Sequence, residues 1–463
     1  MVIYDSVLRK KVPFEPIEEG KVSIYVCGPT VYDDAHLGHA RSAIAFDLLR
    51  RTLEAKGFKV IFVKNFTDID DKIIAKMRQS GQSLEEITQH YIGRYKADMQ
   101  ALHVKDACLE PRATQSLGSM VGVIERLFAK EAAYTLPDGI YFDTQKDPHY
   151  LSLSQQYIDE TRARIEEHSG KKDPKDFALW KFSTDTPTFD SPFGKGRPGW
   201  HLECSAMIYE HLAHTGAHQI DIHAGGADLL FPHHENEAAQ TRCAFGQNLS
   251  KYWMHNGFVT IGGEKMSKSL GNSFFVKDAL GVYDGEILRF YLLSSHYRAD
   301  FNFNEEDLLA SKRRLDKLYR LKKRVVGPQI SEPDKGFTCK VLDALSDDLN
   351  ISKALASLDE MVLQGNETLD KTPKDKKSKQ TLLANLVWIE KVLGIGLHDP
   401  VAYFQLGVST EQKTQIQASI EARQEAKKAK DFAKADAIRD TLLAQGIQLM
   451  DTAEGTQWER IVG

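Results

Sequence analysis

The pattern of hydrophobic and polar positions opens with two short apolar runs separated by one amphipathic segment. Residues 22–26 and 58–63 have the length and the β-branched and aromatic content of buried strands. Between them, residues 40–55 place apolar side chains at helical spacing, and Gly57 follows as a helix stop. A strand, a helix and a second strand predict the opening of a doubly wound parallel α/β sheet, a Rossmann-like fold that binds ligands beyond the carboxyl ends of its strands.

Later segments extend this sheet and then give way to helices. Residues 109–198 are richer in Asp, Pro and Gly and predict an insertion, after which the sheet is expected to resume at 220–223 and 257–261. Beyond residue 305, apolar stripes at helical spacing predict a helical bundle, with a polar inter-helix loop at 366–380. A small final module should contain an amphipathic helix from Asp431 to a Gly446 cap. The expected segments are therefore 1–108 and 199–305 for the two halves of the α/β domain, 109–198 for the insertion, 306–400 for the bundle and 401–463 for the last module.

Composition narrows the class of protein. A chain of 463 residues with 42% hydrophobic content is globular and too long for one core. The amino terminus has no basic segment followed by an apolar stretch, and no apolar run is long enough to span a membrane, so we expect no membrane contact and a cytoplasmic location. Five scattered cysteines favour reduced thiols over a disulfide framework.

Charge limits how the chain could bind nucleic acid. The net charge of −5 argues against coating RNA by bulk charge, so any contact should depend on a local patch. Residues 312–324 are dense in Lys and Arg, with Asp316 as their one acid. Such a run is usually a solvated helix face, but its density in an acidic chain favours a phosphate-backbone contact. Trp458 could equally stack on an unpaired base or anchor the carboxyl terminus to a core.

Two short motifs combine histidines or lysines with small residues: residues 36–39 read His-Leu-Gly-His, and residues 265–269 read Lys-Met-Ser-Lys-Ser. Together they resemble the ATP-handling signatures of class I aminoacyl-tRNA synthetases. When a carboxylate attacks the α-phosphate of ATP, negative charge grows on the phosphoryl oxygens and on pyrophosphate, and positioned donors and cations stabilise it. We therefore predict catalytic, ATP-binding roles for His36, His39, Lys265 and Lys268.

Two cysteines, one histidine and one glutamate are candidate ligands of a metal ion. His233 and Glu237 are spaced i, i+4 on an expected helix that begins near Pro232, so they can share a face. Cys27 and Cys204 could complete a tetrahedral zinc site, although scattered cysteines are more often buried packing residues. His234 points to another helix face and is expected to be structural.

Other candidate residues keep two interpretations. The small residues around Gly225 and Gly226 could form only a tight turn, but we favour an adenosine site with His223 and Asp228 as polar contacts. Thr67 with Asp70 fits a helix capping box as well as it fits a substrate contact. Trp200 could be a core residue or a substrate contact.

The motifs together resemble one family. With residues 27–33 (Cys-Gly-Pro-Thr-Val-Tyr-Asp), 65–73, 199–207 and 233–237, the chain resembles the cysteinyl-tRNA synthetase family along almost its whole length. The resemblance departs from the usual motif at Leu37, a volume-conserving change, and in a slightly longer stretch between Cys204 and His233.

The resemblance implies an activity and its cofactors. ATP, with Mg²⁺, would activate L-cysteine, and the cysteinyl group would then pass to the terminal ribose of tRNA(Cys). One zinc ion per chain would bind Cys27, Cys204, His233 and Glu237 and take the substrate thiolate as a further ligand. Gly28, Thr67 and Trp200 would contact the substrate, and Lys265 and Lys268 would hold ATP on a mobile loop. Residues 306–400 would contact the tRNA stem and 401–463 the anticodon, in a monomer.

Two rival functions make different demands on the sequence. A ligase that transfers cysteine to an amino-sugar would lack most of the last module, which residues 406–463 supply. A non-catalytic RNA-binding paralogue should show decay of the two ATP motifs, and both are intact. The insertion at 109–198 is too short for a separate editing domain, so serine would have to be rejected by the metal.

Overall fold

The computed structural model describes residues 1–155, 170–261, 264–265, 274–325, 327, 331–452 and 455–461. The chain divides into two compact units. The larger comprises residues 1–311, 335–358 and 391–394, and the smaller comprises residues 312–334, 359–390 and 395–463. Among the described residues, no helix has both the length and the apolar character needed to cross a membrane.

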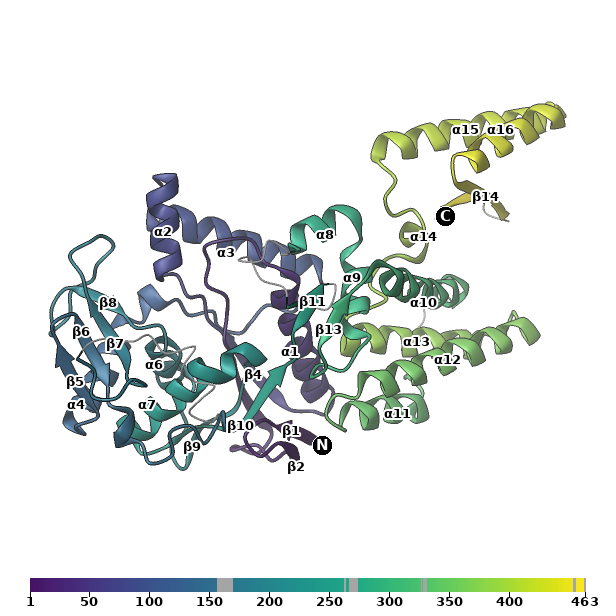
Figure 1. Cartoon of the computed structure of the whole chain (residues 1–463). Helices are drawn as coiled ribbons and strands as arrows, with labels where there is room; N and C mark the ends of the chain where they lie inside the picture. The colour runs from purple at the N-terminus through teal and green to yellow at the C-terminus, as the bar shows by residue number, and fades with distance from the viewer. Residues whose placement is uncertain are drawn as a thin grey trace. The chain divides into compact units, whose positions relative to one another are not determined.

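A four-stranded parallel sheet forms the centre of the larger unit (Figure 1). Its strands, in order across the sheet, are β10 (Asn248–Asn256), β9 (His218–Gly226), β3 (Lys21–Val26) and β4 (Lys59–Lys64). The predicted strands at 22–26, 58–63 and 220–223 are confirmed, as is the doubly wound α/β class. The prediction that 257–261 continues this sheet was wrong, because β11 (Val259–Ile261) pairs instead with β12 (Glu264–Lys265) and β13 (Phe301–Phe303).

Helix α1 (Leu37–Ala55) connects β3 to β4, as two adjacent parallel strands require. It begins three residues before the predicted start because His36 caps it. The Nδ1 atom of His36 accepts from the backbone N–H of Gly38 at 3.1 Å, and Nδ1 of His39 accepts from the N–H of His36 at 3.2 Å. The first histidine motif is therefore itself the beginning of the helix, at the carboxyl edge of the sheet.

The insertion packs on the sheet through a shared core. It contains α4 (Leu117–Ala129) and an antiparallel sheet of β5 (Ala133–Leu136), β6 (Gly139–Phe142), β7 (Phe177–Phe182) and β8 (Gly196–Pro198). Trp180 of β7 is fully buried and belongs to one apolar cluster with Tyr25 of β3 and Ile220 of β9. The same cluster includes side chains of α6 (Leu202–His211) and α7 (Glu235–Phe245). The insertion is thus continuous with the core beneath the carboxyl edge.

The remaining elements of the larger unit flank this core. They are the hairpin β1 (Val2–Asp5) and β2 (Lys10–Pro13), and the helices α2 (Asp71–Ser80), α3 (Leu84–Ala101), α8 (Val276–Val282), α9 (Gly285–Leu293) and α11 (Lys335–Leu345). Helices α10 (Glu305–Val325), α12 (Ile351–Lys371) and α13 (Lys376–Leu393) confirm the helical character expected after residue 305. The polar loop predicted at 366–380 was wrong, since only residues 372–375 interrupt these helices.

The chain ends in a small module with its own core. It contains α14 (Pro400–Tyr403), α15 (Thr410–Lys428), α16 (Phe432–Ala444) and the hairpin β14 (Ile447–Thr452) and β15 (Gly455–Arg460). The predicted helix from Asp431 to Gly446 is confirmed, with Asp431 accepting from the N–H of Lys434. Trp458 is buried against Ile416 and Ile420, so it anchors this module and does not face an unpaired base.

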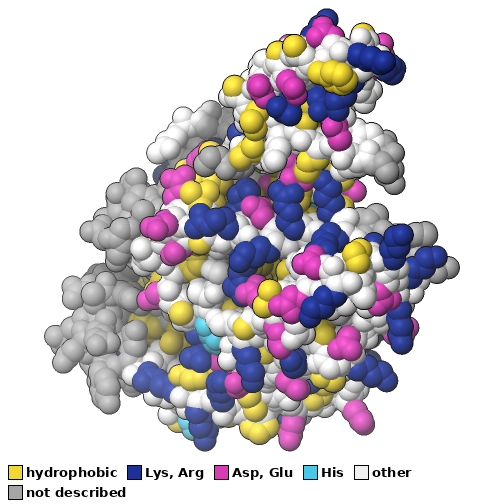
Figure 2. Space-filling view, turned by 90° about the vertical axis from the view of Figure 1, so that its right-hand side faces the viewer, with side chains coloured by type: hydrophobic (Ala, Val, Ile, Leu, Met, Phe, Trp, Pro, Cys, Tyr) yellow, Lys and Arg dark blue, Asp and Glu magenta, His cyan; other side chains and the backbone are white. Residues whose placement is uncertain are grey.

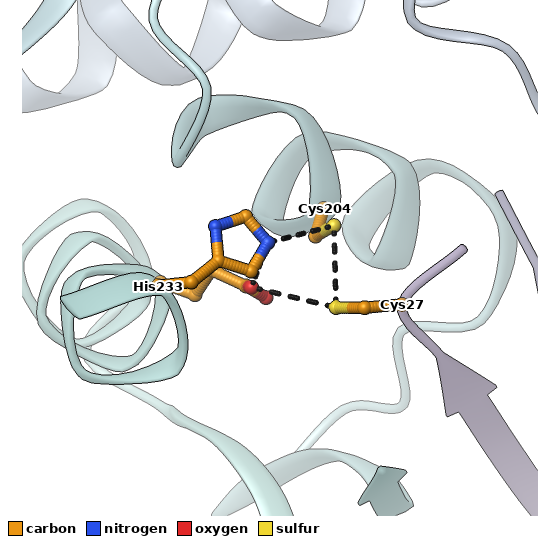
Figure 3. Close-up of side chains that lie close together, drawn as sticks. Cys27, Cys204 and His233 are labelled. Atoms are coloured by element: carbon orange, nitrogen blue, oxygen red, sulfur yellow. Dashed lines mark hydrogen bonds and ion pairs between the residues drawn. The ribbon is translucent and has the colours of Figure 1, made fainter. Parts of the chain in front are cut away.

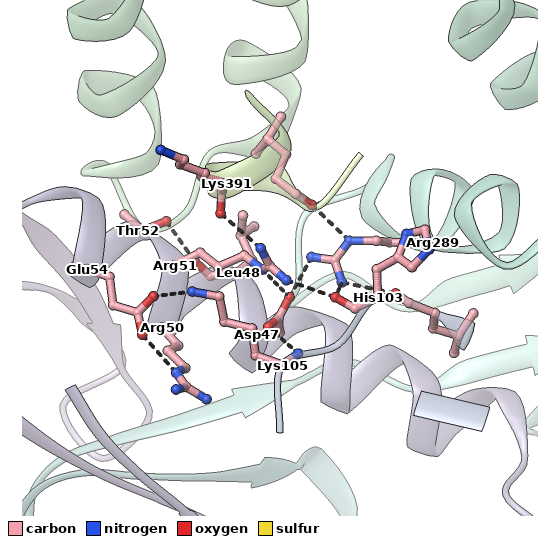
Figure 4. A network of polar contacts seen from close by, with 12 residues as sticks. Asp47, Leu48, Arg50, Arg51, Thr52, Glu54, His103, Lys105, Arg289 and Lys391 are labelled. Carbon is pink, nitrogen blue, oxygen red and sulfur yellow. Dashed lines mark hydrogen bonds and ion pairs between the residues drawn. The ribbon is translucent and has the colours of Figure 1, made fainter. Parts of the chain in front are cut away.

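A buried charge network fixes the other end of α1 (Figure 4). The Asp47 carboxylate accepts from Nε of Arg51 at 2.7 Å and from Arg289 of α9 at 2.5 Å. The two guanidinium groups also donate to the carbonyls of His103, Lys391 and Leu393. Because α1 begins with the histidine motif, this network helps to hold that motif at a fixed position.

Candidate active site

The predicted metal ligands converge beyond the carboxyl end of β3 (Figure 3). Cys27 follows β3, Cys204 lies on α6, His233 precedes α7 and Glu237 lies within it. Their ligand atoms all lie within 4.8 Å of one another. The Sγ atoms of Cys27 and Cys204 are 3.6 Å apart, and Nε2 of His233 lies 3.6 Å from Sγ of Cys204 and 2.9 Å from Oε1 of Glu237.

The local fold differs from the sequence prediction at the start of α7. The helix was expected to begin near Pro232, but it begins at Glu235 after a separate turn in which Phe231 is extended. His233 therefore lies just before the helix. It still reaches Glu237, as the i, i+4 spacing predicted.

The electrostatics of this cluster favour a bound cation. Burial opposes ionisation of Glu237, but the charges of His233 and His223 and their hydrogen bonds hold its pKa at about 2. Burial also opposes ionisation of Cys204, yet hydrogen bonds from Cys27 and His233 lower its pKa to about 6. Burial and the neighbouring thiol raise the pKa of Cys27. A buried carboxylate and a ready thiolate, with a second thiol and an imidazole, are a donor set that fits zinc.

His223 and Trp200 hold two of these ligands in place. His223, predicted to contact ATP, is fully buried, and its Nε2 lies 2.7 Å from Oε2 of Glu237. It orients the carboxylate, as groups around a metal site commonly do. Trp200 is 39% exposed and stacks on His233, with ring centroids 4.3 Å apart, which makes it a wall of the site and not a core residue.

Two further histidines extend the cluster from Cys27: the sequence predicted His234 to be structural and did not indicate His255. Nε2 of His234 lies 3.3 Å from Sγ of Cys27, and Nδ1 lies 2.8 Å from Nε2 of His255. Burial and the surrounding histidines hold the pKa of His234 well below its ordinary value, so the ring is neutral. His234 does lie on a different face from His233, as predicted, but that face also reaches the cluster. His255 ends β10 on the same sheet edge, and this edge was the signal that could have identified it.

The segment after β4 contacts Gly28, the residue that follows Cys27. The N–H of Gly28 donates to Oδ1 of Asn65 at 2.8 Å, and a Cβ atom at Gly28 would lie 1.6 Å from the Asn65 carbonyl oxygen. Thr67 is buried and donates to Glu203, the neighbour of Cys204, at 2.8 Å. The predicted capping box between Thr67 and Asp70 was wrong, because Asp70 caps α2 alone by accepting from the N–H of Lys72.

The two motif histidines present a common edge. The rings of His36 and His39 are stacked with centroids 3.8 Å apart. Each Nδ1 accepts a backbone hydrogen bond, so each neutral ring carries its proton on Nε2. Two stacked imidazoles at the start of a helix thus offer N–H donors where a helix favours negative charge.

The remaining predicted ATP contacts are partly described. Lys268 lies outside the described residues, and of Lys265 only the backbone, in β12, is described. Gly225 is the second-last residue of β9, where a Cβ atom would lie 2.9 Å from Leu229 and 3.0 Å from His234. At Gly226 a Cβ would lie 2.5 Å from Oδ1 of the exposed Asp228. A Cβ atom at Gly225 would press on the buried His234 ring, whereas at Gly226 it would meet only the end of the exposed Asp228 side chain, which can move away.

The basic run at 312–324 is largely paired within the smaller unit. Arg314 pairs with Asp359, Lys322 with Glu390, and Lys323 with Glu459. Figure 2 shows Lys and Arg side chains interspersed with Asp and Glu over the side of the molecule that it presents. The arrangement favours the interpretation as a helix face over that of a dedicated phosphate-binding patch.

Comparison with solved structures supports the fold. The chain superposes on a Mycobacterium tuberculosis methionyl-tRNA synthetase bound by methionyl-adenylate, with a TM-score of 0.60 and 15% identity. The match covers 85% of this chain and 95% of that chain. At this identity the similarity concerns the fold, a class I synthetase fold.

Comparison with protein families and curated sequences is more specific. Residues 13–313 match the model of the class I (C) tRNA synthetase catalytic domain, and residues 340–398 match the DALR domain. The cysteine–tRNA ligase of Nitratiruptor sp. is 64% identical over the whole of both chains, and that of Aliarcobacter butzleri is 60% identical over 99% of both. The chain therefore belongs to the cysteine–tRNA ligase family of class I aminoacyl-tRNA synthetases, and it charges tRNA with cysteine in an ATP-dependent reaction.

Proposed function

We propose that Cys27, Cys204, His233 and Glu237 bind one zinc ion that selects cysteine over serine by coordinating the substrate thiolate. The observation that carries this proposal is the convergence of two sulfurs, one imidazole nitrogen and one carboxylate oxygen within 4.8 Å. When bound, zinc would lower the pKa of a coordinated thiol and discriminate against a hydroxyl, which is a poorer ligand at neutral pH.

Three further residues border the proposed metal site. Trp200 stacks on His233 and is also partly exposed to solvent, so its ring could cover a small amino acid bound at the site. Gly28 keeps the backbone close to Asn65, and Thr67 holds Glu203 beside Cys204. We propose these three residues, Gly28, Thr67 and Trp200, as the ones that position cysteine.

The activation step would use the motif residues. His36 and His39 would donate from Nε2 to the phosphate oxygens of ATP, and Lys265 and Lys268 would stabilise the departing pyrophosphate, with Mg²⁺ on the phosphates. Gly225, Gly226 and Asp228 would lie along the adenosine. A tRNA(Cys) ribose hydroxyl would then attack the adenylate, with the anticodon bound by the last module, in a monomer that acts in the cytoplasm, where tRNA is charged.

Metal analysis and a cobalt spectrum test this function. We expect one zinc ion per chain. In Cys204→Ala and His233→Ala, zinc binding should be weakened or lost, and cysteine activation should fall with it. Cys243→Ala, a partly buried cysteine outside the cluster, is the matched control and should retain both. A cobalt-substituted protein should change its spectrum with cysteine and not with serine. Active enzyme without zinc, or an unchanged cobalt spectrum at saturating cysteine, would refute the proposal.

A further inference from the structure

The segment that follows the predicted lysine loop is hydrogen-bonded directly to the histidine motif. Residues 274–277 run beside residues 34–37, and His36 and Phe275 form an antiparallel bridge. The N–H of Leu37 donates to the carbonyl of Phe274 at 3.1 Å, and the N–H of Val276 donates to the carbonyl of Ala35 at 2.8 Å. His36 and Phe275 are more than two hundred residues apart in sequence, yet this bridge joins their backbones directly.

One carboxylate reinforces this backbone bridge. The Oδ2 atom of Asp34 lies 2.6 Å from Nζ of Lys277, which follows the bridge, and Oδ1 lies 3.2 Å from Nε of Arg94 on α3. The Asp34 side chain is 11% exposed, whereas Lys277 and Arg94 are 37% and 41% exposed. Desolvation opposes ionisation of Asp34, but Lys277 and Arg94 together hold its pKa below the ordinary value. The pair is therefore charged at neutral pH, and its strength is reduced by solvent at the lysine end.

The triad of Asp34, Lys277 and Arg94 differs from an ordinary surface ion pair in its position. Asp34 lies two residues before His36, at the entry to α1. Lys277 lies at the start of α8, eight residues after the end of the predicted loop at Ser269. The ion pair thus resists sliding of residues 274–277 along the backbone that sets the direction of the two imidazoles.

We propose that Asp34 and Lys277 are positioning residues that hold the root of the lysine loop in register with His36 and His39, and so set the affinity for ATP. The proposal rests on the ATP-binding role proposed for the two histidines. Small errors in the placement of reacting groups are costly in rate and affinity, so a partly exposed pair can still matter at this position. Cysteine binds in the metal cluster, on other elements, and should be affected little.

The chain contains a matched control at the other end of the same helix. Glu54 also accepts from one arginine and one lysine, Arg50 at 2.9 Å and Lys105 at 2.5 Å, and Lys105 is 38% exposed. Burial opposes ionisation of Glu54, but Lys105 and Arg50 lower its pKa, as Lys277 and Arg94 lower that of Asp34. Because α1 contains 19 residues, the two triads are separated by roughly 28 Å.

ATP–pyrophosphate exchange at varied ATP and varied cysteine tests the proposal on the full-length protein. We expect Lys277→Met and Asp34→Asn each to raise the KM for ATP about three- to tenfold, with the KM for cysteine changed less than about twofold. The double variant should be no worse than the more affected single variant, because each substitution removes the same Asp34–Lys277 pair, and Lys277→Arg should retain most of the affinity. Lys105→Met and Glu54→Gln should leave the KM for ATP unchanged, and thermal melting should show that every variant is folded.

Three results would overturn the proposal in distinguishable ways. An unchanged KM for ATP in folded Lys277→Met and Asp34→Asn would show that the pair does not position the motif. An equal rise in Lys105→Met would show a general effect of losing a triad. His39→Ala serves as the reference for the proposed function. If His39→Ala itself leaves ATP use intact, the ATP role of the histidines fails and the inference fails with it, whereas a crippled His39→Ala beside a normal Lys277→Met refutes the inference alone.

Discussion

Removing the Asp47 carboxylate should destabilise the larger unit severely. In Asp47→Ala, Arg51 and Arg289 keep their bonds to backbone carbonyls but lose the anion between them, and the N–H of Lys105 loses its acceptor. Arg289 and Asp47 are 0% and 1% exposed, so water cannot replace the lost charge. Breaking a buried pair by removing one partner costs about 3–5 kcal/mol, and we expect about 4 kcal/mol here.

Urea unfolding, with hydrogen exchange of peptides from residues 37–55 to assign the transition, measures this loss. Asp347→Ala is the control in the same unit, because Asp347 and its partner Lys11 are 49% and 42% exposed and such pairs contribute on the order of 0–1 kcal/mol. Asp47→Asn, which keeps an oxygen acceptor, should fall between the two. A loss below about 1 kcal/mol in Asp47→Ala, or one equal to that of Asp347→Ala, would refute this account of the network.

The pH dependence has a definite sign. The folded-state pKa of Asp47 is lowered, because Arg289 and Arg51 outweigh the desolvation that opposes ionisation. The carboxylate therefore contributes its full stability above the unfolded pKa of about 3.9, and this contribution is lost as the pH falls through the folded value. The difference in the free energy of unfolding between wild type and Asp47→Ala should be constant near neutrality and should become smaller only below about pH 4.

Four changes probe the site and the termini. Gly28→Ala should reduce cysteine activation about tenfold or more, because the added Cβ overlaps the Asn65 carbonyl, whereas Gly122→Ala, with nothing within 4 Å, should be neutral; equal activities would contradict this. Trp200→Ala should raise the KM for cysteine in exchange assays and leave that for ATP nearly unchanged; equal shifts would argue against a substrate contact. Lys268→Ala should slow exchange about a hundredfold or more, roughly 3 kcal/mol, while near-normal exchange in folded protein would remove it from the mechanism. A chain ending before Pro400 should still activate cysteine but charge tRNA poorly, and unchanged charging would refute the anticodon assignment.

The sequence predicted strands well where their residues are apolar and poorly where burial depends on hydrogen bonds. β3 and β4 are apolar runs, and both were predicted. β10 was missed because it buries polar residues: Ser250 donates to backbone carbonyls, and His255 bonds to His234. The prediction of a polar loop at 366–380 was wrong for a related reason, because lysines and amides suit an exposed helix as well as a loop. Pro373 lies in the short break at 372–375 between α12 and α13, and the rest of the segment is helical.

The candidate site was predictable in its members but not in its surroundings. The spacing of His233 and Glu237 alone indicated that pair, although His233 precedes α7 and does not lie within it. The positions of Cys204 and His223 depend on how α6 and β9 pack after the insertion, which no local pattern specifies. The contact of His223 with Glu237 was therefore not indicated by the sequence.

The order of strands in the central sheet has a consequence for synthesis on the ribosome. β3 is paired with β9, and Ile24 lies opposite Ile222, so one edge of β3 has no partner until β9 has been translated. The proposed metal site of Cys27 likewise remains incomplete until Glu237, the last proposed ligand in the chain, has been translated. At elongation rates of about 5–20 residues per second, this delay is roughly 10–40 seconds. During that interval the nascent chain exposes an apolar strand edge and a free thiol, so chaperones and the availability of metal during translation should affect the yield of folded enzyme.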